Sequence, residues 1–196
     1  MDYEGGTWDG VAAQSETDYT GFGLEGEAGY RLGTFTGSFG WDITARVGID
    51  IWSRDINDTF DVTGRYVKGY TEVYTIQNLR LGTGPSWNFG RWNARFIAGG
   101  KYPFATNEFI SEDELGYDDD LNLEPKGKWS PFFNFYNYFQ LSDNVLLVLD
   151  VYYDTYQFDP SDPVSPKVNG VPVTPVYQPE SKQVNYGLQA GVSMAF

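Results

Sequence analysis

Pairs of carboxylates are the residues of this chain whose spacing comes closest to a catalytic arrangement. Glu25 and Glu27 stand two residues apart, and Asp150 and Asp154 stand four apart. In an extended strand the members of each pair point to the same side, with Cα atoms ~7 or ~13 Å apart. Such a pair could in principle act as acid and base in glycoside hydrolysis. Arginines on the same faces would keep both carboxylates ionised, whereas a general acid must carry a proton.

The chain has no cysteine and no histidine among its 196 residues. Disulfides, thiolate nucleophiles and cysteine-bound metals are therefore excluded. Without histidine, the chain also lacks the commonest general base and the commonest transition-metal ligand. Every Ser–His, Cys–His and Asp–His mechanism is excluded with it. We expect a protein that is not an enzyme and needs no cofactor.

Hard metal ligands gather only in the acidic segment 108–124, which contains no basic residue. Oxygen ligands at this density could hold Ca²⁺ or Mg²⁺. The consecutive residues Asp118, Asp119 and Asp120 are the candidate ligands, but their spacing departs from the Asp-x-Asp-x-Asp-Gly pattern of calcium loops. We therefore expect a solvated acidic loop rather than a metal site.

Charged residues of both signs recur at every second position of several segments, so that they share one face of the predicted strands. The near balance of sign predicts mutual ion pairing that fills a polar interior, and the alternative is a narrow polar path that selects a solute. Arg46, Arg91 and Arg95 in particular are expected to pair with acidic partners. The predicted set comprises Glu25, Glu27, Arg31, Asp42, Arg46, Asp50, Glu72, Arg80, Arg91, Arg95, Lys101, Asp150 and Asp154.

The elements that would position these charges are long β-strands. Apolar and polar residues alternate with period two in seven runs, and the cleanest one sets Trp41, Ile43 and Val47 against Asp42 and Arg46. Gln77 interrupts the third run, which predicts a bulge there. The runs span about 19–32, 39–51, 66–82, 90–103, 129–140, 144–157 and 182–196. The apolar face is expected to contact lipid through Trp41, Trp92, Phe96, Trp129, Phe133, Leu147, Leu149, Val151, Leu188 and Val192.

The connections between the runs are alternately short and long, as in bacterial outer-membrane barrels. An even number of strands needs one more strand before Tyr19, and residues 2–13 are the only candidate. We therefore predict one all-β domain over residues 1–196, a closed antiparallel up-and-down transmembrane β-barrel. It would have eight strands, or ten where a long loop hides a hairpin. Short turns are predicted at 33–37, 82–88 and 141–144, and long loops at 53–65, 104–128 and 158–181.

The last long loop is rich in proline and contains Asn169–Gly170 between valines. Asn-Gly in such a setting is a strong signal for a type I′ hairpin. Prolines on both sides would block edge pairing and stiffen the segment. The segment is either a protruding recognition hairpin or a restrained loop.

The C-terminal segment resembles the last strand of small Gram-negative outer-membrane barrels of the OmpA, OmpX and OmpW class. It ends in Phe196 and has apolar residues at every second position before it, namely Tyr186, Leu188, Val192 and Met194. In that class such a terminus is the signal for the barrel-assembly machinery, so the resemblance implies that machinery as a partner. It also implies a location in the bacterial outer membrane, among lipid and lipopolysaccharide. Divalent ions could bridge the acidic loop to lipopolysaccharide phosphates.

Composition narrows the function further. The net charge of -14 argues against a nucleic-acid partner, and no stretch approaches the ~20 apolar residues of a spanning helix. The chain opens without the basic and apolar regions of an export signal, which we take to have been removed. We expect a monomer that acts through its extracellular loops, by surface contact or adhesion, or as a narrow channel for small solutes. The alternative is a soluble lipocalin-like barrel that binds a ligand inside.

Overall fold

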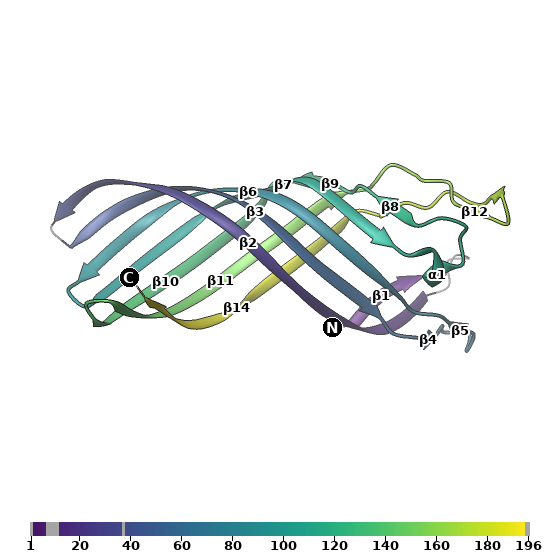
Figure 1. The fold of residues 1–196 in the computed structure, drawn as a ribbon, viewed down its shortest axis with the longest axis horizontal. Coiled ribbons are helices and arrows are strands. Elements are labelled where there is room, and N and C mark those ends of the chain that lie inside the picture. The colour runs from purple at the N-terminus through teal and green to yellow at the C-terminus, as the bar shows by residue number, and fades with distance from the viewer. Residues whose placement is uncertain (1, 7–11, 37, 195–196) are drawn as a thin grey trace.

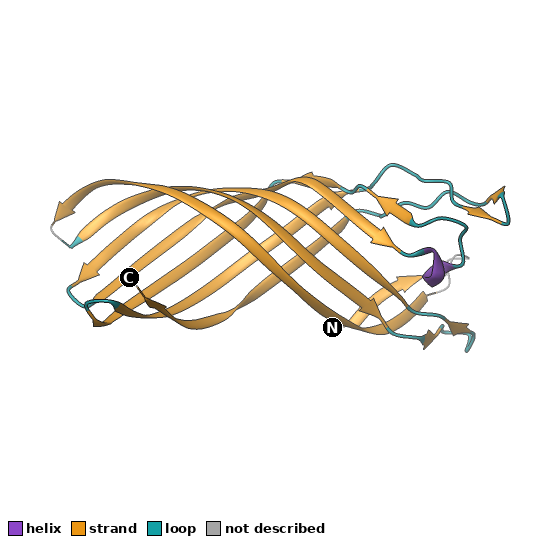
Figure 2. Ribbon diagram, in the orientation of Figure 1, coloured by secondary structure: helices purple, strands orange, loops and turns teal. Residues whose placement is uncertain are grey.

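The protein forms one large antiparallel sheet of long strands (Figures 1 and 2). A computed structural model describes the backbone of residues 2–6, 12–36 and 38–194. Each strand of the main path pairs antiparallel with the next, in the order β1 (Asp2–Gly6), β2 (Ala12–Thr36), β3 (Phe39–Ile56), β6 (Tyr70–Phe89), β7 (Trp92–Ile110), β10 (Ser130–Ser142), β11 (Val145–Asp159) and β14 (Ser181–Met194). The predicted all-β, antiparallel, mostly meandering architecture is thereby confirmed.

The two faces of the sheet have opposite chemistry. Along β3, Asp42, Thr44 and Arg46 are 6%, 2% and 4% exposed. Ile43 and Val47, between and beside them, are 47% and 57% exposed. In this part of β3 the alternation therefore buries the polar residues and exposes the apolar ones.

The buried face is concave, because it brings together strands that are far apart in the sheet. The Tyr156 hydroxyl of β11 donates to Asp50 of β3, although three strands lie between them. Arg95 of β7 likewise reaches Glu27 of β2. The sheet thus curls around an interior. Within the described ranges β2 and β14, which run in the same direction, do not pair with each other.

The described part of the N-terminal strand does not run along the sheet as predicted. β1 covers only Asp2–Gly6, and β2 begins at Ala12 rather than near Tyr19. β1 pairs with the first residues of β2, from Asp2 opposite Glu16 to Gly6 opposite Ala12. It therefore lies at the loop end of the sheet instead of running along the sheet's full length.

The turn predicted at 82–88 is wrong, because β6 continues to Phe89 and the chain turns at Gly90–Arg91. Gly82 serves packing, since a Cβ there would stand 2.6 Å from Ile97 Cγ2 and 2.9 Å from Phe132 Cζ. Gly90 has φ 72°, so it is the glycine that the turn requires. The register of β6 with β7 does shift between Gln77 and Asn78, where a bulge was expected.

Short elements gather at the opposite end, on the right of Figure 1, where they are folded rather than loose. They are β4 (Thr59–Phe60), β5 (Tyr66–Val67), α1 (Glu112–Leu115), β8 (Leu121–Leu123), β9 (Lys126–Lys128), β12 (Lys167–Val168) and β13 (Val171–Pro172). Ile110, Leu121 and Leu123 form a small core there. Asn169 and Gly170 have φ 52° and 77°, as a type I′ turn needs, which confirms the predicted hairpin.

The described residues contain no helix long and apolar enough to cross a membrane.

Candidate functional site: a charged interior

A continuous chain of ion pairs, hereafter the ladder, runs along the buried face. It begins near the turn end, where Arg31 Nε lies 2.7 Å from Asp42 Oδ1. The other oxygen of Asp42 lies 3.0 Å from Arg95 Nε. Arg95 continues to Glu27 at 2.8 Å, and Glu27 contacts Arg46 at 2.6 Å. Four charged residues from three strands thus lead to Arg46, which is 4% exposed.

From Arg46 the ladder continues towards the loop end. Arg46 lies 3.2 Å from Glu25, and Glu25 lies 3.1 Å from Arg80. Arg80 lies 3.4 Å from Asp154, whose same oxygen is 2.6 Å from Lys101 Nζ. Every charge in this stretch therefore has an oppositely charged neighbour.

The ladder ends at Lys101, which is 0% exposed. Its Nζ lies 3.9 Å from Asp50 and 3.1 Å from the ring centroid of Tyr156. Asn78 Nδ2 donates to Asp50 at 2.8 Å. Desolvated charges of this kind are tolerable because each is paired and hydrogen-bonded.

The ladder is electrically neutral. Its cations are Arg31, Arg46, Arg80, Arg95 and Lys101, and its anions are Glu25, Glu27, Asp42, Asp50 and Asp154. These ten residues belong to the set predicted from the sequence. Because each carboxylate is held by a cation, the arrangement offers no protonated carboxyl group for acid catalysis.

The remaining predicted residues lie elsewhere. Arg91 is exposed in the β6–β7 turn, so the expectation that it lies on the polar face and pairs there is wrong. Glu72 is 1% exposed and accepts from Arg54 Nε at 2.6 Å, near the loop end. Sequence reasoning missed Arg54 because residues 53–65 were assigned to a loop, although Arg54 continues the alternation of β3. Asp150 lies on the buried face but makes no ion pair with any described residue.

A cavity of about 770 Å³ adjoins the ladder between the edge strands β2 and β14. Its walls carry the rings of Tyr19, Trp52, Tyr136, Tyr152 and Tyr156. Charged residues of the ladder and Asp150 face the same space. The ladder thus fills one side of the interior, and the cavity lies on the other side, between β2 and β14.

The acidic loop uses its carboxylates to hold backbone groups. Asp118 accepts hydrogen bonds from the amides of Asn169 and Gly170, at 2.8 and 2.6 Å, and so fixes the hairpin turn. Asp120 accepts from the amide of Glu112 at 3.0 Å. Among the described residues no three acidic side chains converge as metal ligands would.

Two aspartates organise the β4–β5 hairpin. Asp61 accepts hydrogen bonds from the amide and hydroxyl of Thr63 and from the amide of Arg65, at 2.6–3.0 Å. Chiefly the Thr63 hydroxyl bond holds the pKa of Asp61 below its usual range. Asp58 accepts from the Tyr66 hydroxyl at 2.5 Å, which lowers the pKa of Asp58 in the same way.

The residues predicted to meet lipid or the assembly machinery lie on the exposed face. Tyr186, Leu188 and Val192 of β14 are 78%, 65% and 58% exposed. Met194 pairs with Val145 through the backbone, and Phe196 lies outside the described residues.

Comparison with models of known protein families gives no match, and comparison with curated proteins gives none either.

Proposed function

We propose that this chain is a non-enzymatic integral outer-membrane β-barrel of the Gram-negative type. The observation that carries the proposal is the inverted distribution of polarity: the concave face of the sheet carries a neutral ion-pair ladder, and the outer face is broadly apolar and exposed. An exposed apolar surface of this extent is unfavourable in water but suits hydrocarbon. A lipocalin-like barrel would instead turn its apolar face inward, around the ligand.

Closure of the sheet into a barrel is part of the proposal. Edge strands in hydrocarbon would leave backbone N–H and C=O groups without hydrogen-bond partners, each at a cost of several kcal/mol. β2 and β14 carry apolar outer residues along their edges, such as Leu24 and Leu188, which are 72% and 65% exposed. We therefore expect the N-terminal strands and β14 to be joined in lipid.

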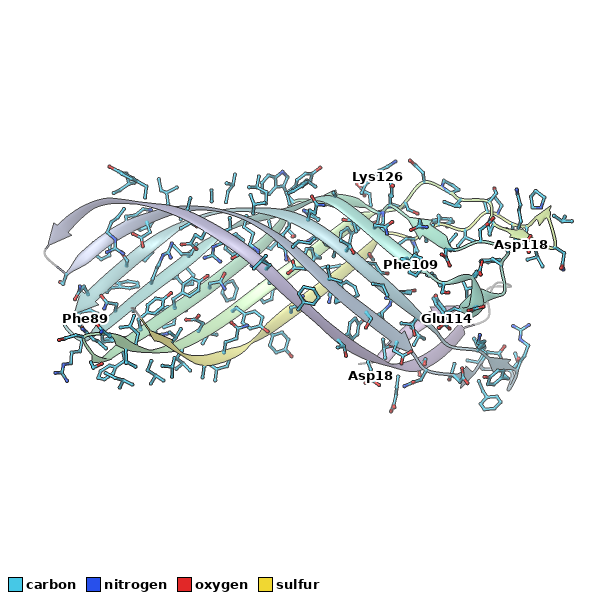
Figure 3. The ribbon with its side chains drawn as sticks, viewed as in Figure 1. Asp18, Phe89, Phe109, Glu114, Asp118 and Lys126 are labelled. Carbon is cyan, nitrogen blue, oxygen red and sulfur yellow. The ribbon has the colours of Figure 1, made fainter. Side chains whose placement is uncertain are left out.

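The working part is the loop end. The ladder crosses the interior from β2 and β3 to β7 and β11, where it would block bulk flow. The folded loop elements expose the acidic Asp118 (Figure 3) and the aromatic rings of Phe60, Tyr66 and Tyr177. We infer that the protein acts by contact between this end and a surface or ligand outside the cell.

A second candidate is a narrow path for small solutes, and the cavity beside the ladder is the observation that favours it. Single-channel recording of the refolded protein in a planar bilayer separates the two. We expect insertion without steady conductance. Steady, ion-selective conductance would favour the channel over the blocked barrel. A folded monomer in detergent-free buffer would overturn the membrane proposal.

A further inference from the structure

Glu108 is a buried carboxyl group at the loop end that takes no part in the ladder. It is 1% exposed and stands on β7 between Tyr74 of β6 and Leu123 of β8. Tyr74 belongs to an apolar cluster inside the sheet, and Leu123 belongs to the small core of the loops. Glu108 is therefore enclosed by apolar groups on both sides.

The position of Glu108 along the sheet is above the proposed lipid band. Its row across the strands continues through Tyr74 and Trp52 to Gly21 of β2. Gly21 precedes Phe22, and in that part of β2 the outer face is polar, with Glu16, Asp18 and Thr20 exposed. We therefore place Glu108 in the part of the sheet that lies outside lipid.

A second buried carboxylate lies diagonally across from Glu108. Glu72 of β6 is 1% exposed, and its Oε2 accepts hydrogen bonds from Arg54 Nε and from the Tyr74 hydroxyl, at 2.6 and 3.0 Å. The Tyr74 hydroxyl has one hydrogen, so it cannot donate to both carboxyl groups. Glu108 Oε2 is buried and has no hydrogen-bond partner among the described residues. An ionised Glu108 would thus place a second negative charge beside Glu72, with no donor for that oxygen.

The remaining groups packed around Glu108 do not compensate such a charge. The three residues of β8, 121–123, carry no ionisable group. Tyr70 and Tyr117 pack against the core of the loops, but phenol groups are uncharged at neutral pH. The groups whose charge bears on Glu108 are therefore Glu72 and Arg54.

Glu108 holds a proton at neutral pH as long as the loop end is closed. Burial, and after it the charge of Glu72, raise the pKa of Glu108 to about 8, and Arg54 offsets only part of this rise. In an opened loop end, where water reaches the carboxyl group, its pKa would return to the ordinary value of about 4.3. Between these two values the closed state binds one more proton than the open state. Closure therefore weakens as the pH rises through this range and changes no further above about pH 8.

We propose that Glu108 is a pH-sensitive latch that holds β8 and the core of the loops on β7. With its proton, the carboxyl group remains buried without a charge, and β8 covers it. When the proton is lost, the buried charge repels Glu72, so β8 separates from β7 and water reaches the carboxylate. The latch depends on contacts within the loop end and needs no ligand there, so this inference goes beyond the proposed function.

The test is amide hydrogen exchange of residues 121–123 in the full protein, refolded in uncharged detergent and followed between about pH 5 and 9. Protection, corrected for the intrinsic exchange rate, should fall by up to about tenfold per pH unit and level off above about pH 8. Infrared spectra of the same samples should show a protonated carboxyl group at pH ~7 that is lost by pH ~9.

Glu108→Gln keeps the shape of the protonated acid but cannot ionise. Its protection should not change with pH, and the infrared band that is lost above neutral pH should be missing. Glu124→Gln is the matched control, because it removes the same charge from an exposed position next to β8, and it should keep the profile of the unaltered protein. Glu72→Gln removes the repelling charge, so protection should level off at a lower pH, and this variant tests the latch even where Glu108→Gln does not fold.

The same pH dependence in the unaltered protein and in Glu108→Gln would overturn the latch. Protection in the unaltered protein that does not change with pH would overturn it as well. Insertion into bilayers decides the proposed function separately, so failure of the latch leaves that function intact.

Discussion

Lys101 shows what it takes to keep a charge in the interior of this sheet. Its ammonium group is wholly buried, yet it has Asp154 at 2.6 Å, Asp50 at 3.9 Å and the face of Tyr156. Removing the partner of such a charge costs far more than removing both members of the pair. The ladder is therefore best probed by comparing single and double changes.

We expect Lys101→Met to lower the free energy of unfolding by about 3–5 kcal/mol, since the buried Asp154 charge would lose its nearest cation. The double variant Lys101→Met/Asp154→Leu should lose less than the sum of the two single changes. Urea unfolding in detergent micelles measures these differences. Lys126→Met is the control: its bridge to Asp162 is 2.7 Å long but lies in solvent, so ~0–1 kcal/mol is expected. Additive losses would show that Lys101 and Asp154 do not act as a pair.

Asp61 predicts a local dependence on pH at the β4–β5 hairpin. Its pKa is lowered in the folded protein, so its hydrogen bonds stabilise the hairpin fully above the ordinary aspartate pKa of about 3.9. That stabilisation is lost as the pH falls through the lowered pKa. Amide hydrogen exchange at Thr63 and Arg65, corrected for its intrinsic rate, should accelerate as the pH falls below about 4. In Asp61→Asn the protection should be low at every pH, and an unchanged profile would contradict the assignment.

At the scale of elements, the loop end is held together by contacts between loops. Asp118 comes from the acidic loop, but its carboxylate binds both turn residues of the β12–β13 hairpin. Its own amide donates to the carbonyl of Lys167 at 2.9 Å. The two longest loops therefore form one unit.

Asp118→Ala should release the hairpin from the acidic loop, because the amides of Asn169 and Gly170 lose their acceptor. We expect limited proteolysis within residues 160–178 to become several-fold faster, as for a loss of about 1 kcal/mol. Asp119→Ala removes a neighbouring exposed carboxylate for which the structure shows no such contact, and it should leave cleavage unchanged. Equal cleavage of both variants would mean that Asp118 is not needed to hold the β12–β13 hairpin in place.

Period-two alternation predicted seven long strands, but β3 and β7 continue to Ile56 and Ile110, into segments that were predicted as loops. The prediction failed where glycine, which is typical of turns, lies instead at a closely packed position within a strand. Gly82, Gly84 and Pro85 have the composition of a turn, but a neighbouring strand and the Phe132 ring press against Gly82, which local sequence cannot reveal. The partners within the ladder could not be predicted either, because Arg95 and Glu27 meet only through the curl of the sheet.

For the whole molecule, the apolar outer face is the feature that decides between membrane and water. Val47 lies in the middle of this face on β3 and is 57% exposed. Its neighbours on the exposed side, Ala45 and Ile49, are also apolar. In lipid, a charged side chain at such a position would be unfavourable.

Val47→Arg should therefore lower the stability of the protein in lipid vesicles by ~2–4 kcal/mol, the cost of a basic residue at the bilayer midplane. Ser53→Arg places the same residue on the same face but nearer the loop end, where ~0–1 kcal/mol is expected. Guanidinium unfolding in vesicles, followed by tryptophan fluorescence, compares the two. Equal, small effects would mean that the exposed face does not lie in lipid.

The length of β2 has a consequence for what can reach the protein. Its 25 residues extend ~80 Å, which gives ~55 Å of height at a tilt of ~45°. The apolar band of such barrels is only ~25 Å tall. The outer residues of β2 before Phe22 are the polar, exposed Glu16, Asp18 and Thr20 (Figure 3 labels Asp18). In the proposed orientation the ten residues before Phe22 form a rigid stalk in water, which would hold the loop unit ~20 Å above the apolar band, where a partner outside the cell could contact it without touching the hydrocarbon.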